Sequence, residues 1–296
     1  MNSDSNPSRL PVTSSVASPD HILAVEHLNV FYETDAGPFP ALQDISLHVE
    51  RGARIAIVGE SGSGKSTLGL AIAGFLNGGG VSVNAARLVF DGRCISMSRL
   101  HRLPSVPLGL AMVFQDAMTS LDPVWTIGSQ INAVIRRDRR VGQSEARLRA
   151  VDWLERVGLG ADSVRVLGAR PYELSGGMRQ RAMLAIALCA GPRLLIADEP
   201  TSALDASLSR EVMELLVRLT TDLGTTLILV THDIFLCRQY TQRMIVMRGG
   251  RIVDDCAADR IVEDASDPYT RGLLRCVPSI ETIGLARLPT MEHPDA

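Results

Sequence analysis

One short stretch, GESGSGKST at positions 59–67, limits the folds open to this chain more than any other feature. It fits the pattern G-x-x-x-x-G-K-[ST], in which glycines let successive backbone N–H groups turn inward around an anion. The apolar run RIAIVG before it predicts a buried strand, and TLGLAIAGFL after it has helical spacing. A helix that begins at such a loop adds the partial positive charge of its N-terminus. The stretch therefore predicts a strand–loop–helix unit that binds a phosphate group.

The polar side chains of this loop have distinct expected roles. Lys65 can reach the β- and γ-phosphates of a nucleotide, and the hydroxyl of Ser66 can bind Mg²⁺. The alternative is a Gly/Ser-rich turn that happens to precede a helix, and the lysine, the hydroxyl and the flanking segments together disfavour it. The residues that we expect to bind ATP from this loop are Gly59, Glu60, Ser61, Gly62, Ser63, Gly64, Lys65, Ser66 and Thr67.

Two later apolar runs end in polar residues. RLLIADEP (193–200) ends in adjacent carboxylates, at the kind of strand end where open α/β sheets bind ligands. Asp198 is placed to bind Mg²⁺ and Glu199 to polarise a water molecule, although acids at this position can also cap the next helix. The run in TTLILVTHD (225–233) ends at His232. A lone histidine is usually structural, but at this edge we expect it to contact the γ-phosphate.

Strand-like and helical segments alternate along the chain, which predicts an α/β fold with a largely parallel sheet. Residues 120–170 break this alternation and indicate a helical insertion, with Leu148, Val151, Leu154 and Val157 on one apolar helical face. RMIVMRGGRIVDD predicts a hairpin that turns at Gly249–Gly250. We expect a disordered tail at 1–20, one domain at 21–280 with a helical subdomain at about 118–190, and a short tail at 281–296.

Composition excludes several classes of protein. The net charge of −3 argues against nucleic-acid binding driven by bulk charge, and the basic run RRDRR (136–140) is best interpreted as a solvated helix end. No apolar stretch is long enough to predict a membrane span. The cysteines lack the spacing of a zinc site or a disulfide framework, and we expect small buried apolar residues at Cys94, Cys189, Cys237, Cys256 and Cys276.

A second glycine pair lies in LSGGMRQR (174–181), far from the first loop. Ser175 can cap the helix that begins there, and the N–H groups of Gly176 and Gly177 can bind an anion. Six motifs occur in order: the phosphate loop, Gln115 in VFQD, LSGGMRQR, LLIADEP, SALD (202–205) and VTHD. In this order they resemble the nucleotide-binding subunits of ABC transporters, over roughly residues 22–280. The resemblance implies a P-loop ABC cassette with a mainly parallel core, an antiparallel β subdomain and a helical insertion.

The resemblance also implies why the chain has two glycine stretches. In this family two ATPase subunits pack head to tail, so Ser175, Gly176 and Gly177 should bind the γ-phosphate of an ATP molecule held by the partner chain. Met178 replaces the glutamine common in the family, which should tune this site. The matching motifs imply that Tyr32 (or Phe31, one residue away) stacks on the adenine and that Ser66 and Asp198 bind Mg²⁺.

They also imply that Gln115 contacts Mg²⁺ or the attacking water and that Glu199 is the general base. Asp205 would make a contact across the dimer interface, and His232 would contact the γ-phosphate.

Three stretches are similar to a narrower group, the oligopeptide, dipeptide and nickel importers. They are FQDAMTSLDPVWTIGSQI (114–131), LSGGMRQRAMLAIAL (174–188) and DPYTRGLL (267–274). Ala117, Asp122 and Asp267 replace the Pro, Asn and His usual in that group. The cysteine-bearing C-terminal extension of many members is absent, with only Cys276 present, so we expect no iron–sulfur cluster and a less specific indication of a peptide substrate.

The resemblance implies an ATPase that uses ATP and Mg²⁺ to power solute uptake at the cytoplasmic face of the inner membrane. Its partners would be a second ATPase subunit (identical or different), two membrane-spanning permease subunits and, indirectly, a solute-binding protein, with no nucleic acid. One alternative is a soluble ABC-type ATPase acting on ribosomes or DNA, but those usually have two cassettes or a long coiled-coil insertion. The other is a degenerate module that only binds ATP, which Lys65, Glu199 and His232 disfavour.

Overall fold

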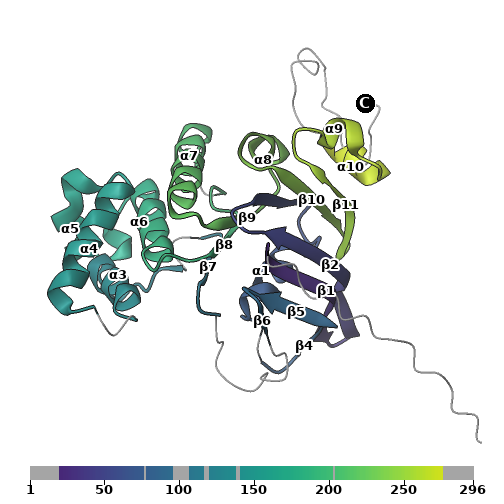
Figure 1. Cartoon of the computed structure of the whole chain (residues 1–296), viewed down its shortest axis with the longest axis horizontal. Helices are drawn as coiled ribbons and strands as arrows, with labels where there is room; N and C mark the ends of the chain where they lie inside the picture. Colours follow the sequence, from purple (N-terminus) through teal and green to yellow (C-terminus); the bar gives the residue numbers. More distant parts are fainter. Residues whose placement is uncertain are drawn as a thin grey trace, which may run out of the picture.

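The molecule contains two β-sheets, with helix α1 (Lys65–Ala73) between them and the other helices at the left and the top of the view (Figure 1). The computed structural model describes residues 20–76, 78–95, 107–116, 120–137, 141–202 and 204–275. The strands are β1 (His21–Thr34), β2 (Gly37–Glu50), β3 (Arg54–Val58), β4 (Val81–Asn84), β5 (Arg87–Phe90), β6 (Arg93–Cys94), β7 (Leu110–Val113), β8 (Leu194–Asp198), β9 (Thr226–Thr231), β10 (Arg243–Arg248) and β11 (Arg251–Ala257). The helices are α1 (Lys65–Ala73), α3 (Ile127–Ile135), α4 (Gln143–Arg156), α5 (Ser163–Gly168), α6 (Gly176–Leu188), α7 (Ala206–Leu223), α8 (Ile234–Tyr240), α9 (Ile261–Asp264) and α10 (Pro268–Arg275), with 3₁₀ turns η2 (Gly160–Asp162) and η3 (Pro171–Glu173).

The larger sheet has six strands in the order β11-β10-β3-β9-β8-β7. Neighbours from β10 to β7 are parallel, and only β11 is antiparallel, to β10. Parallel strands place their carboxyl ends at one edge, so the ends of β3, β9, β8 and β7 lie side by side. The antiparallel pair β10–β11 turns through Gly249 and Gly250, whose positive φ values of 53° and 76° suit a two-residue hairpin turn. The hairpin predicted at these glycines is thus confirmed.

Residues of the parallel strands alternate between two hydrophobic clusters, because successive side chains of a strand point to opposite faces. Ile55 and Ile57 of β3 face the cluster between the two sheets, whereas Ala56 and Val58 face the cluster under the helices. Strands buried on both faces are continuous apolar runs, which explains the sequence RIAIV.

The smaller sheet is antiparallel, with the order β2-β1-β5-β6 and with β4 paired to β1. Helix α1 lies between the two sheets and contacts β2 on one side and β7, β8 and β9 on the other (Figure 1). The antiparallel sheet and the mainly parallel sheet together confirm the predicted fold class. Helices α3, α4, α5 and α6 lie between β7 and β8 in the sequence and gather at one end of the molecule.

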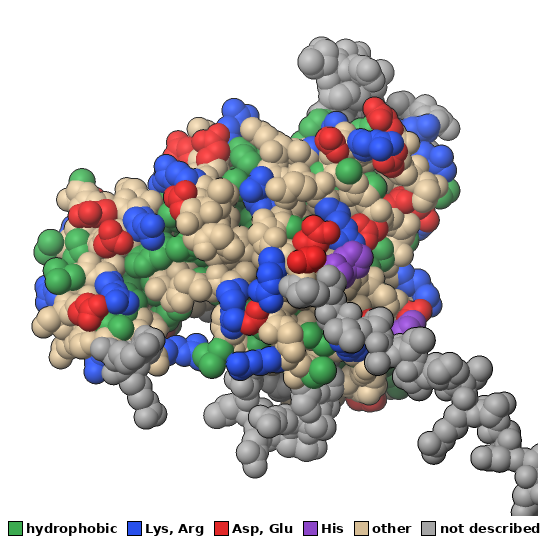
Figure 2. All heavy atoms as spheres, viewed as in Figure 1, with side chains coloured by type: hydrophobic (Ala, Val, Ile, Leu, Met, Phe, Trp, Pro, Cys, Tyr) green, Lys and Arg blue, Asp and Glu red, His purple; other side chains and the backbone are tan. Residues whose placement is uncertain are grey.

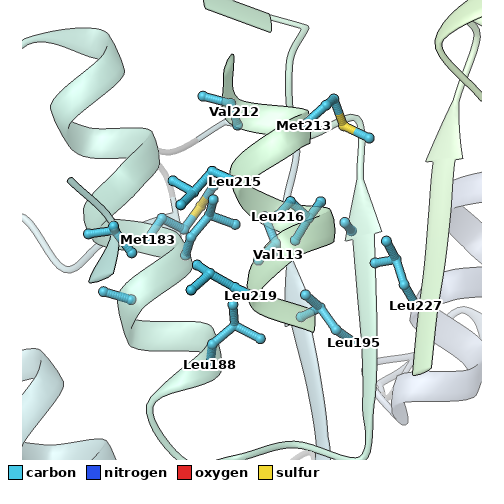
Figure 3. Close-up of a cluster of buried hydrophobic side chains, with 14 of the residues drawn as sticks. Val113, Met183, Leu188, Leu195, Val212, Met213, Leu215, Leu216, Leu219 and Leu227 are labelled. Atoms are coloured by element: carbon cyan, nitrogen blue, oxygen red, sulfur yellow. The ribbon is translucent and has the colours of Figure 1, made fainter. Parts of the chain in front are cut away.

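Helices α6 and α7 pack against each other and cover one face of the parallel sheet. Figure 3 shows Met183 and Leu188 of α6 beside Leu215, Leu216 and Leu219 of α7. Val113, Leu195 and Leu227 close the cluster from three neighbouring strands. This packing fixes α6, and with it the glycine pair at its start, against the strands that carry the site.

Replacing Leu216 with alanine tests this packing. Leu216 is fully buried in α7, so Leu216→Ala leaves a cavity and should lower the free energy of unfolding by about 2–5 kcal/mol. Urea unfolding followed by circular dichroism measures the change. The exposed Leu148→Ala is the matched control, and a loss below about 1 kcal/mol for Leu216→Ala would show that this contact is loose.

The apolar face predicted for the insertion helix does not coincide with its buried face. Leu148 is 71% exposed, while Ala146, Ala150, Trp153 and Leu154 are buried in α4. A helix turns about 100° per residue, so Leu148 lies about 200° from Ala146 and faces solvent. The buried face of α4 combines two small alanines and a tryptophan with Leu154, so the spacing of large aliphatic residues alone does not identify it.

The cysteine prediction holds for one position and fails for another. Cys237 is buried, and burial raises the pKa of its thiol well above the usual value. Cys94 is exposed, because it ends the two-residue edge strand β6. Cys276 lies outside the described residues. None of the helices in the described ranges is long and apolar enough to cross a bilayer.

Candidate functional site

Four neighbouring strands bring the predicted site residues to one edge of the parallel sheet. The loop 59–67 follows β3, and His232 follows β9. Asp198 ends β8 with Glu199 next to it, and Gln115 lies two residues after β7. Residues separated by more than a hundred positions thus meet because β3, β9, β8 and β7 are adjacent and parallel.

The loop 59–67 fits tightly against its surroundings at two glycines. Gly59 has φ +152°, and a Cβ there would lie 2.2 Å from the carbonyl oxygen of Met247. Gly64, the N-cap of α1, has φ +100°, and a Cβ there would lie 2.8 Å from the carbonyl oxygen of Ala41. Only glycine fits both the backbone conformation and the space. The loop leads directly into α1, whose first N–H groups have no hydrogen-bond partner within the helix.

Lys65 is the only lysine in the loop, and it is almost fully buried. Its Nζ donates hydrogen bonds to the carbonyl oxygens of Gly59 (2.9 Å) and Glu60 (2.8 Å). Burial lowers the pKa of Lys65, and the nearby carboxylates of Glu199 and Asp198 oppose that shift. The ammonium group is therefore held at the loop that would contain the phosphates.

Ser66 and Asp198 bring two oxygen-bearing side chains together beside the loop. The Ser66 hydroxyl donates to Oδ1 of Asp198 at 3.1 Å. Burial raises the pKa of Asp198, although the hydrogen bond from Ser66 lowers it in part. One carboxylate and one hydroxyl suit Mg²⁺, which keeps several waters and binds substrate phosphates rather than a full set of protein ligands. In the described part of the chain no three His, Cys, Asp or Glu side chains form a metal cluster of their own.

Glu199 has a polar partner on each carboxylate oxygen. The Gln115 side-chain amide donates to Oε2 at 3.4 Å, and Nδ1 of His232 lies 3.2 Å from Oε1. The backbone of Glu199 has φ 45°, which is uncommon for a residue with a side chain, and its N–H donates to the carbonyl oxygen of Val230. Strained backbone of this kind gathers at functional sites, and here it holds a mostly buried carboxylate near Lys65 of the loop.

The glycine pair of LSGGMRQR lies in a different place, at the start of α6. Ser175 is the N-cap, and its Oγ accepts the N–H of Met178 at 3.4 Å. Ser175, Gly176 and Gly177 line an open pocket of about 630 Å³ together with Asp205. Asp205 is itself the N-cap of α7 and accepts the N–H groups of Ser207 and Leu208. The residues lining this pocket include none from the loop 59–67.

Several residues of this pocket were missed from the sequence. They come from the segment after α4, from α6 and from the start of α7, and are Gly158, Leu159, Arg181 and Leu208. Arg181 donates to the carbonyl oxygen of Val157 and to Glu211 and so joins these elements. Neighbouring Gln180 donates to the carbonyl oxygen of Pro200, just after Glu199. Arg181 ends the LSGGMRQR motif, but no motif contains Gly158, Leu159 or Leu208, which reach this pocket only through tertiary packing.

Tyr32, the aromatic residue expected at the adenine, has a second aromatic side chain opposite it on the same hairpin. Tyr32 is half-buried on β1 and packs against the cluster between the sheets. Its cross-strand partner Phe39 is 57% exposed. The hairpin that carries both touches the loop, since Ala41 lies against Gly64. Phe39 is therefore a second candidate, and only the pairing of β1 with β2 reveals it.

Comparison with known protein families agrees with this arrangement. The family model described as ABC transporter matches residues 42–202. A second model, described as an AAA domain with a putative AbiEii toxin of a type IV toxin–antitoxin system, matches residues 167–238 and overlaps the first.

Similar proteins and structures come from the same family. The chain is 41% identical to the dipeptide transport ATP-binding protein DppD of Escherichia coli (strain K12), over 90% of this chain and 82% of DppD. It is 38% identical to the oligopeptide transport ATP-binding protein AppD of Bacillus subtilis (strain 168), over 88% of this chain and 79% of AppD.

Among solved structures, cbiO1 from Clostridium perfringens, part of the ABC transporter complex cbiONQ, matches with a TM-score of 0.67 and 30% identity over 83% of this chain and 92% of that one. The dimeric post-hydrolysis state of the ATP-binding cassette MJ0796 bound to ADP and Pi matches with a TM-score of 0.67 and 26% identity, over 80% and 98%. The chain therefore belongs to the ABC transporter family, as one of its ATP-binding, ATP-hydrolysing subunits.

Proposed function

We propose that this chain closes with a second cassette over two MgATP molecules and so powers peptide uptake through membrane-spanning partners. The observation that carries the proposal is the meeting of Gln115, Glu199 and His232 beside Lys65 at the edge of four parallel strands. The domain would span residues 21–280 with a helical subdomain at about 118–190, leaving tails at 1–20 and 281–296.

Catalysis would rest on positioning and charge, since phosphoryl transfer asks little covalent chemistry of the protein. Glu199 would orient a water molecule and accept its proton, while Gln115 and His232 hold the two carboxylate oxygens in place. Lys65 and His232 would spread the charge that develops on the γ-phosphate. The loop 59–67 would wrap the phosphates with its backbone N–H groups, and Tyr32 or Phe39 would stack on the adenine.

Mg²⁺ would be held by the oxygens of Ser66 and Asp198, with Gln115 within the same group of side chains. When bound, the ion would neutralise charge on the β- and γ-phosphates. Asp198 must be ionised for this purpose, and its raised pKa means that a cation or Lys65 has to offset the cost of burying the carboxylate.

The glycine pair at α6 would serve an ATP molecule bound by the other subunit. Gly176 is exposed, and a Cβ there would meet no atom within 4 Å, so packing inside this chain does not require glycine. Gly177, by contrast, packs against Leu208. A glycine facing open space at a capped helix N-terminus suits the close approach of an anion from outside. Asp205, in the same pocket, would contact the partner across the interface.

Replacing Lys65 tests the nucleotide site. Lys65→Ala removes a charged donor to the phosphates and should weaken ATP binding about 10- to 100-fold. Titration with a fluorescent ATP analogue measures the dissociation constant. Because Lys65 is the cation of the loop, equal affinity in the variant would mean that the loop does not hold the phosphates as proposed.

A peptide is the proposed solute class, since DppD is named for dipeptide transport and AppD for oligopeptide transport. Asp122, which departs from the asparagine usual in the importers, has a local structural role. Oδ1 of Asp122 accepts the N–H groups of Val124 (2.8 Å) and Trp125 (3.3 Å), a turn that an asparagine oxygen could also form. Ala117 lies outside the described residues.

The proposed partners are a second ATPase subunit, identical or different, and two permease subunits, with a solute-binding protein acting through them. The proposed location is the cytoplasmic face of the inner membrane. No nucleic acid is proposed as a partner, and Figure 2 supports this: basic and acidic side chains are interspersed over the visible face. A soluble ABC ATPase and a degenerate ATP-binding module remain the alternatives to be tested.

The test is recovery of native partners. A tagged Glu199→Gln copy, isolated from solubilised native membranes in MgATP, should bring with it two multispan proteins and a second ATPase identified by mass spectrometry. Recovery with ribosomes, or alone from the soluble fraction, would contradict the transport function while leaving the ATPase in place. Hydrolysis confined to a second, different cassette would favour the degenerate module.

A further inference from the structure

A tyrosine near the end of the described chain touches the phosphate loop directly. The backbone N–H of Glu60 donates a hydrogen bond to the hydroxyl of Tyr269, with an N···O distance of 2.9 Å. The two residues are 209 positions apart, and Tyr269 is only 3% exposed. Tyr269 belongs to DPYTRGLL, a stretch that none of the roles above explains.

The bonded N–H belongs to the same peptide group as the carbonyl of Gly59. That carbonyl oxygen accepts the hydrogen bond from Nζ of Lys65 at 2.9 Å. In a trans peptide the oxygen and the hydrogen point in opposite directions, so one rigid plane connects Tyr269 on one side with Lys65 on the other. Gly59 has few steric limits on rotation of this plane, and the tyrosine supplies the restraint that the glycine lacks.

Tyr269 is held firmly enough to act as such a restraint. Oδ1 of Asp267 accepts the N–H of Tyr269 at 2.7 Å. Asp254 of β11, itself nearly buried, accepts the N–H groups of Ser266 (3.0 Å) and Asp267 (3.1 Å) and so fixes the start of α10 to the sheet. Arg248 of β10 lies over the ring, with Cζ 4.8 Å from its centroid.

We propose that Tyr269 is a positioning residue for ATP binding: through the Gly59–Glu60 peptide it orients Lys65, and so ties the DPYT segment (267–270) to the phosphate loop. The proposal rests on the ATP site described above. Replacing Asp267 by the histidine usual in the importers would keep a side-chain acceptor for the Tyr269 N–H in one tautomer, so the restraint does not depend on the aspartate charge.

Tyr269→Phe removes only the hydroxyl and tests the proposal. The dissociation constant for ATP and the KM should rise about 3- to 10-fold, because one hydrogen bond to the loop is lost, while kcat at saturating ATP stays within about two-fold. Tyr240→Phe is the matched control, because Tyr240 lies in the same hydrophobic cluster with its hydroxyl near Glu214 and Arg210. Unchanged ATP affinity in Tyr269→Phe would overturn the proposal.

A double-mutant cycle separates positioning from general stabilisation. In a Lys65→Ala background the peptide has no lysine to orient, so Tyr269→Phe should change the dissociation constant less than about two-fold. An equal fold-change in both backgrounds would overturn the proposal. If the wild-type protein bound no ATP, the proposed function itself would fail, whereas binding by wild type with no effect of Tyr269→Phe would remove the inference alone.

A measurement on the wild-type protein covers the case in which the variant does not fold. The amide of Glu60 should be protected from hydrogen exchange in the nucleotide-free protein, because its N–H is bonded to a buried hydroxyl. Exchange at the rate of an unprotected loop amide, observed by NMR, would overturn the proposal.

Discussion

Glu199→Gln is expected to bind ATP with nearly wild-type affinity and to hydrolyse it at least about 100-fold more slowly, the usual contribution of a general base. The amide has the shape of the carboxylate and keeps an oxygen near Gln115 and His232, but it cannot accept a proton from water. Phosphate release at saturating MgATP measures the rate, and titration with nucleotide measures the affinity. The split between the two assigns Glu199 to chemistry rather than to binding.

The matched control for this variant is Glu263→Gln, the same chemical change at an exposed position of α9. It should leave both rate and affinity unchanged. Hydrolysis by Glu199→Gln at the rate of the wild-type protein would remove Glu199 from the role of base, and Asp198 would then need examination. Loss of ATP binding would mean that the carboxylate supports the loop itself.

Ser175→Arg is expected to lower hydrolysis about 100-fold, the effect of losing a donor aimed at transition-state charge, while the isolated monomer binds ATP normally. Ser175 is exposed and lines the pocket at the start of α6, so an arginine would fill the space that we assign to the partner's ATP. It would also remove the N-cap that accepts the N–H of Met178. Hydrolysis is measured on the assembled complex and binding on the monomer.

Ser144→Arg provides the comparison, because it makes the same substitution at an exposed position of α4 outside that pocket. Its activity should equal that of the wild-type protein. If Ser175→Arg lost ATP binding as a monomer, the pocket would serve the ATP molecule of its own chain, and the head-to-tail arrangement would be wrong.

Much of this site could be predicted because its residues follow local rules. The loop 59–67 and the polar ends of β8 and β9 each combine a buried apolar run with a distinctive polar sequence. The parallel order of the strands then brings them together, and strand–helix alternation already indicates parallel strands. The family resemblance added Gln115 to this chain's own site, beside Glu199. It also added Ser175 and Asp205, whose roles in the partner's site remain predictions.

Other features could not be predicted because they depend on packing between distant segments. The large aliphatic side chain of Leu148 suggested a buried position, but the face of α4 that contains Ala146 and Ala150 packs inward and leaves Leu148 exposed. Phe39 competes with Tyr32 only because β1 and β2 pair in this register. The contact of Tyr269 with Glu60 joins segments 209 positions apart, and neither local sequence indicates that the two are in contact.

The central claim is that this chain completes an ATP site on another subunit, and photolabelling tests it most directly. A tagged Lys65→Ala copy, coexpressed with untagged wild-type chain and the native partners, is purified through the tag and irradiated with ATP carrying a photoreactive group on its γ-phosphate. The tagged chain should be labelled at residues 175–178, because the nucleotide is held by the other cassette. Absence of label from the tagged chain, with label on residues 175–178 of the untagged wild-type chain, would contradict the account.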